Sequence, residues 1–478
     1  MNLFWHRRDL RLRDNRGLAL AASDDEVLPV FVFDESLLRQ TGERQRAFLF
    51  AGLDALRGAY RERGSDLVVR RGEPPRALAA VREAVDAETV YYNRHYEPAR
   101  YNRQRRVDRR FPTVAATDVV LVDPGDLDPS YASHGQFYDD WSAQPKPDPV
   151  AAPEPDRLVD PGTYSVESDV EVPAIETDIE LPPAGYEGAR ERYDQFLDDG
   201  IESYADTRDD LSAAVARPVG AVSRMSPYLA AGMIGIREVW QDATDRYEAV
   251  TVGENGTATS DSDTIAGDSD AARNVEKYRY ELSWREANYH LLASDPGLLS
   301  KNHREFPNPI AWRNDEADFA AWQRGETGYP LVDAGMRQLD REGYVHNRPR
   351  QVVASFLTKH LLVDWRKGAR HFEHQLVDHD PAVNYGNWQW VASTGTDTVD
   401  VRIFDPVAQM DKYDPDADYV REYVPELQDV PPEKAVEWPT LDAAERARFA
   451  PDYPDPIVDR DGAYERARRV FETALGQR

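Results

Sequence analysis

The first 125 residues alternate short apolar runs with longer segments in which apolar positions recur every three or four residues. The short runs are rich in β-branched and aromatic residues, which is typical of buried strands. They cover residues 2–5, 27–33, 66–70, 89–93 and 119–122. The longer segments, 43–64 and 74–87, have the spacing of amphipathic helices. Alternating strands and helices predict an α/β domain over residues 1–125, with a parallel, five-stranded, Rossmann-like sheet and right-handed crossovers.

The pattern changes after residue 185, where the strand signal fades and long amphipathic patterns dominate. These patterns cover residues 187–206, 235–250, 274–293, 329–343 and 350–376. Because their apolar positions have helical spacing, residues 186–478 are predicted to form one large all-α domain.

Two segments have neither pattern. Residues 126–185 are rich in proline and acidic side chains, as in "QPKPDPVAAPEPDRLVDPG", and we expect an extended linker over the surface. Residues 251–270, "TVGENGTATSDSDTIAGDSD", are too polar to bury a core, so they are predicted to be a disordered insertion in the helical domain.

The charge balance is strongly acidic. The chain has 87 acidic and 58 basic residues, a formal net charge of −29, and all but seven of the basic residues are arginine. Such a surface is typical of a halophilic protein in a salt-rich cytosol, where charge repulsion is screened, and an acidic mesophilic protein is the alternative. Net acidity argues against nucleic-acid binding by the whole surface, although a local arginine patch can still bind phosphate.

The sequence contains no cysteine and no recognisable secretory signal or transmembrane segment. The absence of cysteine excludes disulfides, a thiolate nucleophile and cysteine-ligated zinc or iron–sulfur clusters. The beginning of the sequence, "MNLFWHRRDL", is charged too early for a secretory signal, and no apolar run could span a bilayer. We therefore expect a cytoplasmic protein without membrane contact. His371 and His374 are three residues apart on a predicted helix, but without a third ligand nearby we expect no metal site.

Several tryptophans share short segments with polar side chains, an arrangement that is less typical of core packing. In "ELSWRE", Glu281 and Trp284 lie one helical turn apart on one face. In "HNRPRQ", two arginines lie where a helix is predicted to begin, so cations and backbone N–H groups would both attract an anion. In "NYGNWQWVASTGTD", Trp388 and Trp390 lie among small and polar residues rather than aliphatic ones.

The polar groups of two further segments could serve either to bind a ligand or to stabilise the local fold. "VSRMSPYL" has Ser223 and Ser226 around Arg224, which suits either a phosphate cradle or a simple helix cap. "DHDPAVNYGNW" has Asp378 and Asp380, which could bind the polar edge of a ring or cap and turn the chain.

Together, these segments resemble the photolyase/cryptochrome family of flavoproteins along nearly the whole chain. The resemblance is carried by "WHRRDLRLRDN", "SRMSPYLAAGMIG", "ELSWRE", "ETGYPLVDAGMRQL", "HNRPRQVVASFL" and "VDWRKGARHFEHQLVDHDPAVNYGNWQWVASTGTD". The sequence most resembles class I cyclobutane pyrimidine dimer photolyases of halophilic archaea, and some positions resemble those of DASH cryptochromes. It implies an antenna domain, a linker and a helical FAD-binding domain. It also implies blue-light-driven repair of cyclobutane pyrimidine dimers in DNA, by electron transfer from excited reduced FAD.

The resemblance implies different roles for neighbouring tryptophans. Trp388 would be the flavin-proximal member of an electron-transfer chain that continues through Trp365 to an exposed Trp312. Trp390 and Trp284 would line the lesion pocket, because flipped-out pyrimidines stack on flat apolar faces.

The same resemblance implies roles for polar residues. Glu281 would hydrogen-bond or protonate the dimer carbonyl, and Asn347 would contact flavin and lesion. Asn384 would face flavin N5, and Arg350 would pair with Asp378. The implied FAD contacts are Tyr204, Val222, Ser223, Met225, Ser226, Tyr278, Arg285, Arg350, Asp378, His379, Asp380 and Asn384. The implied DNA contacts are Arg208, Arg285, Arg348 and Gln351.

Some positions depart from the family pattern. Gln351 stands where bacterial-type dimer photolyases usually have methionine, Asn288 where an aromatic residue is usual, and Val222 where threonine is usual. Because these positions border the implied lesion and flavin sites, a cryptochrome-like photoreceptor with little repair activity stays open as the alternative.

Ala99 and Arg100 do not offer the Asn–Glu pair that binds folate in folate-type photolyases, so a deazaflavin antenna or none is expected. We expect a monomer.

Overall fold

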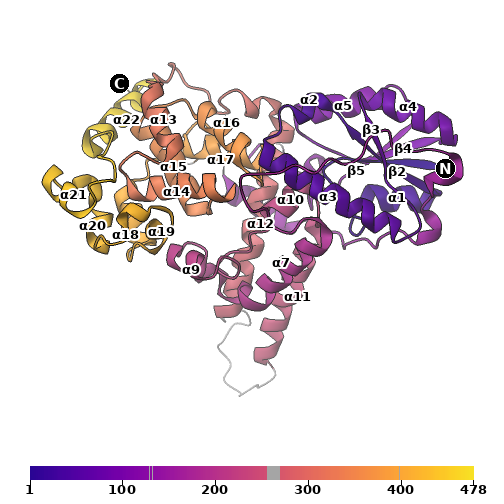
Figure 1. The fold of residues 1–478 in the computed structure, drawn as a ribbon, viewed down its shortest axis with the longest axis horizontal. Helices are drawn as coiled ribbons and strands as arrows, with labels where there is room; N and C mark the ends of the chain where they lie inside the picture. Colours follow the sequence, from indigo (N-terminus) through magenta and orange to yellow (C-terminus); the bar gives the residue numbers. More distant parts are fainter. Residues whose placement is uncertain (129, 132, 256–269, 398, 478) are drawn as a thin grey trace.

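The computed structural model describes residues 1–128, 130–131, 133–255, 270–397 and 399–477. The N-terminal part of the chain forms a parallel five-stranded sheet in the order β3-β2-β1-β4-β5 (Figure 1). Its strands are β1 (Asn2–His6), β2 (Val27–Phe33), β3 (Val68–Arg71), β4 (Thr89–Asn93) and β5 (Thr113–Ala116). Its helices are α1 (Arg16–Asp24), α2 (Glu35–Leu38), α3 (Glu43–Arg61), α4 (Pro74–Val85) and α5 (Pro98–Asp108). The predicted sheet is confirmed.

The fifth strand is not where the sequence predicted it. Residues 119–122 are bent, and β5 is formed by the preceding residues 113–116, which pair with β4. The backbone N–H groups of Leu121 and Val122 donate instead to the carboxylate of Glu286, at 2.8 and 3.3 Å. Because a side chain from a distant helix takes these donors, the apolar run 119–122 cannot extend the sheet.

The two faces of the sheet pack into different cores. Along β1, Leu3 and Trp5 join a cluster that includes Leu78 of α4, whereas Phe4 joins a cluster that includes Phe48 of α3. This alternation follows from the period of two along a strand. The second cluster continues into the helical domain, where it includes Tyr228, so the helical domain is built onto one side of the sheet.

The rest of the chain is mainly helical, as predicted (Figure 1). Its helices are α7 (Gly185–Asp199), α8 (Tyr204–Thr207), α9 (Leu211–Ala216), α10 (Ser226–Ala231), α11 (Ile236–Asn255), α12 (Asp270–Ser294), α13 (Glu316–Arg324), α14 (Pro330–Glu342), α15 (Asn347–Ser355), α16 (Trp365–Gln375), α17 (Pro381–Val391), α18 (Pro406–Tyr413), α19 (Asp418–Tyr423), α20 (Pro432–Val436), α21 (Ala443–Phe449) and α22 (Arg460–Ala474).

The helical pattern over residues 350–376 is broken into two helices. α15 continues into a π-helical turn, Phe356–His360, and Leu362 then has a left-handed backbone with a φ of 51°. Asp364 restarts the helix by accepting a hydrogen bond from the backbone N–H of Arg366 at 2.9 Å, as an N-cap residue does.

The predicted linker contains a helix that the sequence did not predict. α6 (His134–Ala143) packs against α12, and its Trp141 is completely buried. Burial of this indole needs a surface from the helical domain, so the pattern of the linker alone does not show it. The predicted insertion at 251–270 is wrong at its ends, because α11 runs to Asn255 and α12 begins at Asp270. The remaining residues, 256–269, lie outside the described residues.

None of the described helices combines the length and apolar character that crossing a membrane requires. Within the same residues, no three histidine, aspartate or glutamate side chains are grouped so that they could hold a metal ion.

Buried ion pairs join the two domains. The guanidinium of Arg237, on α11, is completely buried and lies 2.7 Å from Asp14 and 2.6 Å from Asp118. Arg11 pairs with Asp118 from the other side at 2.7 Å. Burial raises the pKa of Asp118, but the two guanidinium groups outweigh it and lower that pKa to about 2. Each charge in this network therefore depends on its partners to stay buried.

Replacing Arg237 with methionine is expected to destabilise the fold by about 3–5 kcal/mol, because Asp14 and Asp118 lose a buried partner. The shift of the guanidinium-induced unfolding transition measures this effect. Arg246→Met is the matched control on the same helix, since Arg246 and its partner Glu202 are 38% and 41% exposed. The control should cost less than about 1 kcal/mol, and equal shifts for both variants would contradict this account.

Candidate active site

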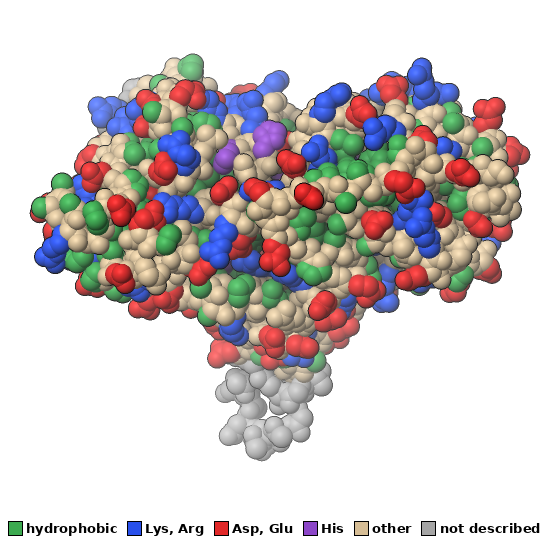
Figure 2. All heavy atoms as spheres, in the orientation of Figure 1, with side chains coloured by type: hydrophobic (Ala, Val, Ile, Leu, Met, Phe, Trp, Pro, Cys, Tyr) green, Lys and Arg blue, Asp and Glu red, His purple; other side chains and the backbone are tan. Residues whose placement is uncertain are grey.

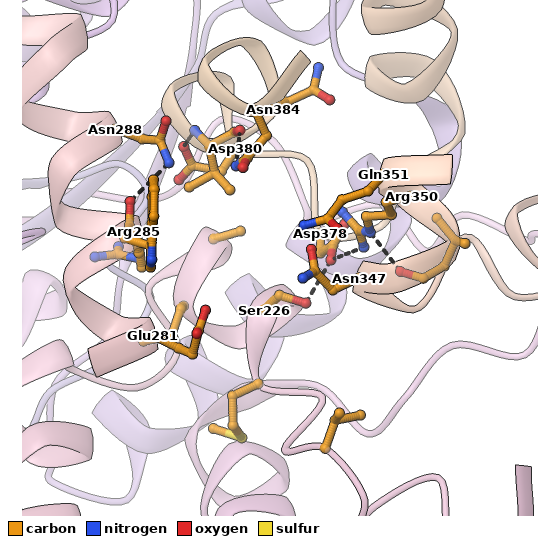
Figure 3. A pocket seen from close by; sticks show the side chains of 18 of the residues that line it. Ser226, Glu281, Arg285, Asn288, Asn347, Arg350, Gln351, Asp378, Asp380 and Asn384 are labelled. Carbon is orange, nitrogen blue, oxygen red and sulfur yellow. Dashed lines mark hydrogen bonds and ion pairs between the residues drawn. The ribbon is translucent and has the colours of Figure 1, made fainter. Parts of the chain in front are cut away.

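A cavity of about 590 Å³ lies in the helical domain between α10, α12, α15 and α17. Figure 3 shows Glu281, Arg285 and Asn288 on one side of it, facing Arg350 and Asp378. Most residues predicted for the site line this cavity. They are Tyr204, Arg208, Val222, Ser223, Met225, Ser226, Tyr278, Glu281, Trp284, Arg285, Asn347, Arg350, Gln351, Asp378, Asp380, Asn384, Trp388 and Trp390. Those not among the lining residues are Trp312, Arg348, Trp365 and His379.

One face of α12 forms a wall of the cavity. Glu281, Trp284, Arg285 and Asn288 recur every three or four residues, so one face of the helix presents all of them. The Oε1 atom of Glu281 accepts a hydrogen bond from Arg208 and lies 2.7 Å from the ammonium of Lys277. Sequence reasoning did not identify Lys277, although its i,i+4 spacing from Glu281 was the available signal.

Asp378 anchors the opposite side of the cavity. The predicted ion pair is present, with Arg350 Nη2 at 2.6 Å from Asp378 Oδ2. Ser226 Oγ donates to the same oxygen at 2.6 Å. The other oxygen, Oδ1, is buried without a hydrogen-bond partner among the described residues. An acceptor is therefore available to a donor group in the cavity.

Asp380 fixes the start of α17. Its Oδ1 accepts two backbone N–H groups of the first turn, at 3.0 and 3.3 Å. Its Oδ2 accepts a hydrogen bond from Tyr289 and pairs with Arg8 of the α/β domain at 3.2 Å. Burial raises the pKa of Asp380, but Arg8 and Arg285 outweigh it and the pKa is lowered overall. An ionised N-cap at this position orients Asn384 and the two tryptophans of α17.

Asn288, which departs from the family pattern, fits its surroundings closely. Its Nδ2 donates to the backbone carbonyl of Trp284 at 2.9 Å. A Cβ atom on Gly386 of α17 would lie 1.9 Å from Asn288 Oδ1. A side chain at position 386 would therefore displace the amide of Asn288 from its present position.

Of the three tryptophans predicted for electron transfer, one lines the cavity and two do not. Trp388 lines it and packs against Phe372, with ring centroids 5.2 Å apart. Trp365 is completely buried at the start of α16, and a Cβ on Gly368, three residues later, would lie 2.3 Å from Trp388. Trp312 is partly exposed. The ring contacts found among the described residues do not join any two of these three indoles, so their transfer role stays a prediction.

Trp388 has a direct indole neighbour that sequence reasoning did not assign to the site. The completely buried Trp322 meets it edge to face, with centroids 6.2 Å apart. Other lining residues were not predicted for the site, although some of them, such as Leu282 and Asn387, adjoin predicted residues in the chain. They are Leu229, Ala230, Tyr280, Leu282, Tyr344, Val345, Ala354, Phe372, Leu376, Val383, Asn387 and Val391.

The arginines predicted to bind DNA have partners within the chain. Arg208 pairs with Glu281, and Arg348 pairs with Asp209 at 2.9 Å. Arg285 donates to a backbone carbonyl at 2.8 Å. On the face shown in Figure 2, basic side chains likewise lie among acidic ones. A DNA phosphate would have to share or replace these partners, so the DNA contacts stay predictions.

Comparison with known proteins identifies the family. Residues 278–473 match the model of the FAD binding domain of DNA photolyase, and residues 2–156 match that of DNA photolyase. The chain is 41% identical over 502 residues to a deoxyribodipyrimidine photo-lyase of Halobacterium salinarum, covering 100% of both chains. It is 32% identical to a cryptochrome DASH of Natronomonas pharaonis, over 96% of this chain and 98% of that one. The chain therefore belongs to the photolyase/cryptochrome family.

Two solved photolyase structures are similar to this chain along nearly its whole length. A class III photolyase from Agrobacterium tumefaciens superposes with a TM-score of 0.81 at 32% identity, covering 100% of this chain and 98% of that one. A photolyase from Sulfolobus tokodaii, described with two FAD molecules, gives a TM-score of 0.77 at 29% identity, over 99% of this chain and 100% of that one.

The residues present fit the FAD that this family implies. The cavity volume is within the range of about 300–1,000 Å³ that small-molecule sites usually have. The unpartnered Asp378 Oδ1 offers an acceptor to a ring N–H, and Arg350 stabilises its charge. Ser226, Arg350, Asp378 and Asn384 are the residues that would hold the polar groups of the cofactor.

His379, beside this site, is expected to make the fold sensitive to acid. Burial, with a smaller contribution from Arg8, lowers its pKa from 6.5 to about 3. As the pH falls from about 6.5 towards 3, the unfolded chain binds a proton that the folded chain does not, so the unfolding free energy falls. His379→Gln should make this decline shallower by up to about 1.4 kcal/mol per pH unit. Urea unfolding between pH 4 and 7 measures it, and an equal change on replacing the exposed His374 would contradict the assignment.

Proposed function

We propose that this chain is a photolyase that repairs cyclobutane pyrimidine dimers in DNA under blue light. The observation that carries the proposal is that one cavity brings two indoles, Trp284 and Trp390, together with Asp378 and Asn384 of the implied flavin side. The photo-lyase relatives, aligned over the whole chain, support the same activity.

The residues that line the cavity have different proposed roles in repair. When bound, reduced FAD supplies the electron after it absorbs blue light. Trp284 and Trp390 offer apolar faces to the flipped-out pyrimidines, and stacking on an aromatic face is worth about 1–3 kcal/mol per base. Arg208 and Lys277 form ion pairs with Glu281. Their two cations would stabilise the negative charge that the transferred electron brings to the lesion. Asn347, exposed at the start of α15, is free to contact the lesion.

Electrons for initial flavin reduction are proposed to enter through Trp312, Trp365 and Trp388. Indoles oxidise more easily than aliphatic side chains, and the series runs from a partly exposed ring to one on the cavity wall. Trp322, which meets Trp388 edge to face, is proposed as a second electron donor to Trp388.

A cryptochrome-like photoreceptor is the alternative. It is favoured by the likeness to a cryptochrome DASH and by Gln351, whose Oε1 accepts a hydrogen bond from Arg348 at 2.6 Å at the edge of the cavity. Such a protein would bind and photoreduce the flavin without repairing the dimer.

A second chromophore is proposed for the α/β domain. A small cavity lies at the ends of β1 and β2, lined by Trp5, Phe31, Arg100 and Arg103. Arg100 is engaged with Glu97 at 2.8 Å, so the position does not offer the pair that folate needs. Arg103 is likewise paired with Asp34, so the proposal is the one that the resemblance implies: a deazaflavin rather than folate, or no second chromophore. The photolyase from Sulfolobus tokodaii, described with a second FAD, supports a flavin-like group.

The acidic composition and the relative from Halobacterium salinarum support a halophilic enzyme. We propose that it acts as a monomer in the cytoplasm, at high salt.

The repair assay uses UV-irradiated oligothymidine and flavin-reduced protein in high salt. Dimers should disappear under blue light and persist in the dark. Trp390→Ala should lower repair at subsaturating DNA roughly five- to 150-fold, because the lesion loses a stacking face worth about 1–3 kcal/mol.

Trp365→Phe is the matched control, since Trp365 is buried outside the cavity. After chemical reduction it should repair at the wild-type rate, because the flavin no longer needs the transfer chain. Persistence of dimers under light, with flavin bound and reduced, would contradict the proposed activity and favour the photoreceptor.

A further inference from the structure

His134, at the start of α6, lies directly against a wall of the cavity. Its imidazole is stacked on the indole of Trp284, with centroids 3.6 Å apart and planes inclined by 6°. Trp284 lines the cavity, whereas His134 is not among the lining residues. An indole has two faces, so His134 covers one and leaves the other to the cavity.

Hydrogen bonds to α12 fix the orientation of the imidazole. Ser283 Oγ donates to the carbonyl of Tyr280 at 2.6 Å, so it accepts from His134 Nε2–H, 3.0 Å away. His134 Nδ1 then accepts from the hydroxyl of Tyr280, at 3.1 Å. This pattern needs a neutral ring with its proton on Nε2. Burial favours it, since it lowers the pKa of His134 to about 4.

The rest of α6 is anchored to the same helix. The indole of the buried Trp141 donates to Glu286 Oε2 at 3.2 Å. Tyr138 donates to Glu276 at 2.9 Å, and its ring meets Tyr280 edge to face with centroids 4.8 Å apart. α6 is therefore held in register with α12, and His134 is held against Trp284.

We infer that His134 is a positioning residue of the lesion site. It covers the outer face of Trp284 and fixes the plane of the indole, so that the inner face is ready to receive a flipped-out pyrimidine. This inference rests on the proposed repair function. Pre-organisation of a stacking surface lowers the ordering cost of binding, so the effect should appear in affinity for the dimer.

Two variants separate the stacked ring from its hydrogen bonds. His134→Ala removes the ring and should weaken binding of a dimer-containing oligonucleotide roughly two- to twelvefold, the range expected for an aromatic pair. Binding of the undamaged oligonucleotide should change less than about twofold, because sequence-independent affinity comes mainly from phosphate contacts. His134→Phe keeps a flat ring and should restore most of the affinity for the dimer. Wild-type flavin content in both variants shows that they are folded.

A double-mutant cycle with Trp284→Ala shows whether His134 acts through Trp284. If it does, His134→Ala has no further effect on dimer binding once Trp284 is absent. The same loss in both backgrounds, or unchanged dimer binding in His134→Ala, overturns the inference. Wild-type protein without preference for the dimer would refute the proposed function together with this inference. Wild-type preference that survives His134→Ala overturns this inference alone.

Discussion

The buried carboxylate of Asp380 is the constraint on which the site depends. It caps α17, and it binds Arg8 from the loop after β1 and Tyr289 from α12. One ionised group thus joins the sheet domain, the wall of the cavity formed by α12 and the helix that carries Trp388 and Trp390. A buried carboxylate is costly without such partners, so docking of the two domains stabilises the start of α17 beside the cavity.

Several other buried charges of the chain are likewise paired with groups of opposite charge. The chain is strongly acidic, yet its buried positions contain arginines paired with aspartates, such as Arg237 with Asp14 and Arg11 with Asp118. Guanidinium groups suit these places because they stay charged and bind carboxylates with a rigid, planar set of donors. Salt screens exposed pairs much more than buried ones. Domain docking and the site can therefore persist at ionic strengths that weaken the surface pairs.

Periodicity predicted the sheet and the helical domain, because strands and amphipathic helices have apolar positions that a single segment reveals. It could not place β5, since Glu286 takes the N–H groups of residues 121–122 from a helix far along the chain. It also missed α6, whose Trp141 is buried only against that helix. Family motifs predicted most of the lining residues, but not the acidic partners of Arg208 and Arg348, because pairing is a property of the fold.

The most direct test of the central role of Asp380 is the flavin content of Asp380→Asn. We predict that purified Asp380→Asn retains less than about a tenth of the wild-type flavin, because a buried Arg8 without its partner costs about 3–5 kcal/mol. Asp405→Asn is the matched control, since Asp405 caps α18 and pairs with Arg460 but is one-third exposed. It should keep its flavin. Wild-type flavin content in Asp380→Asn would contradict the account.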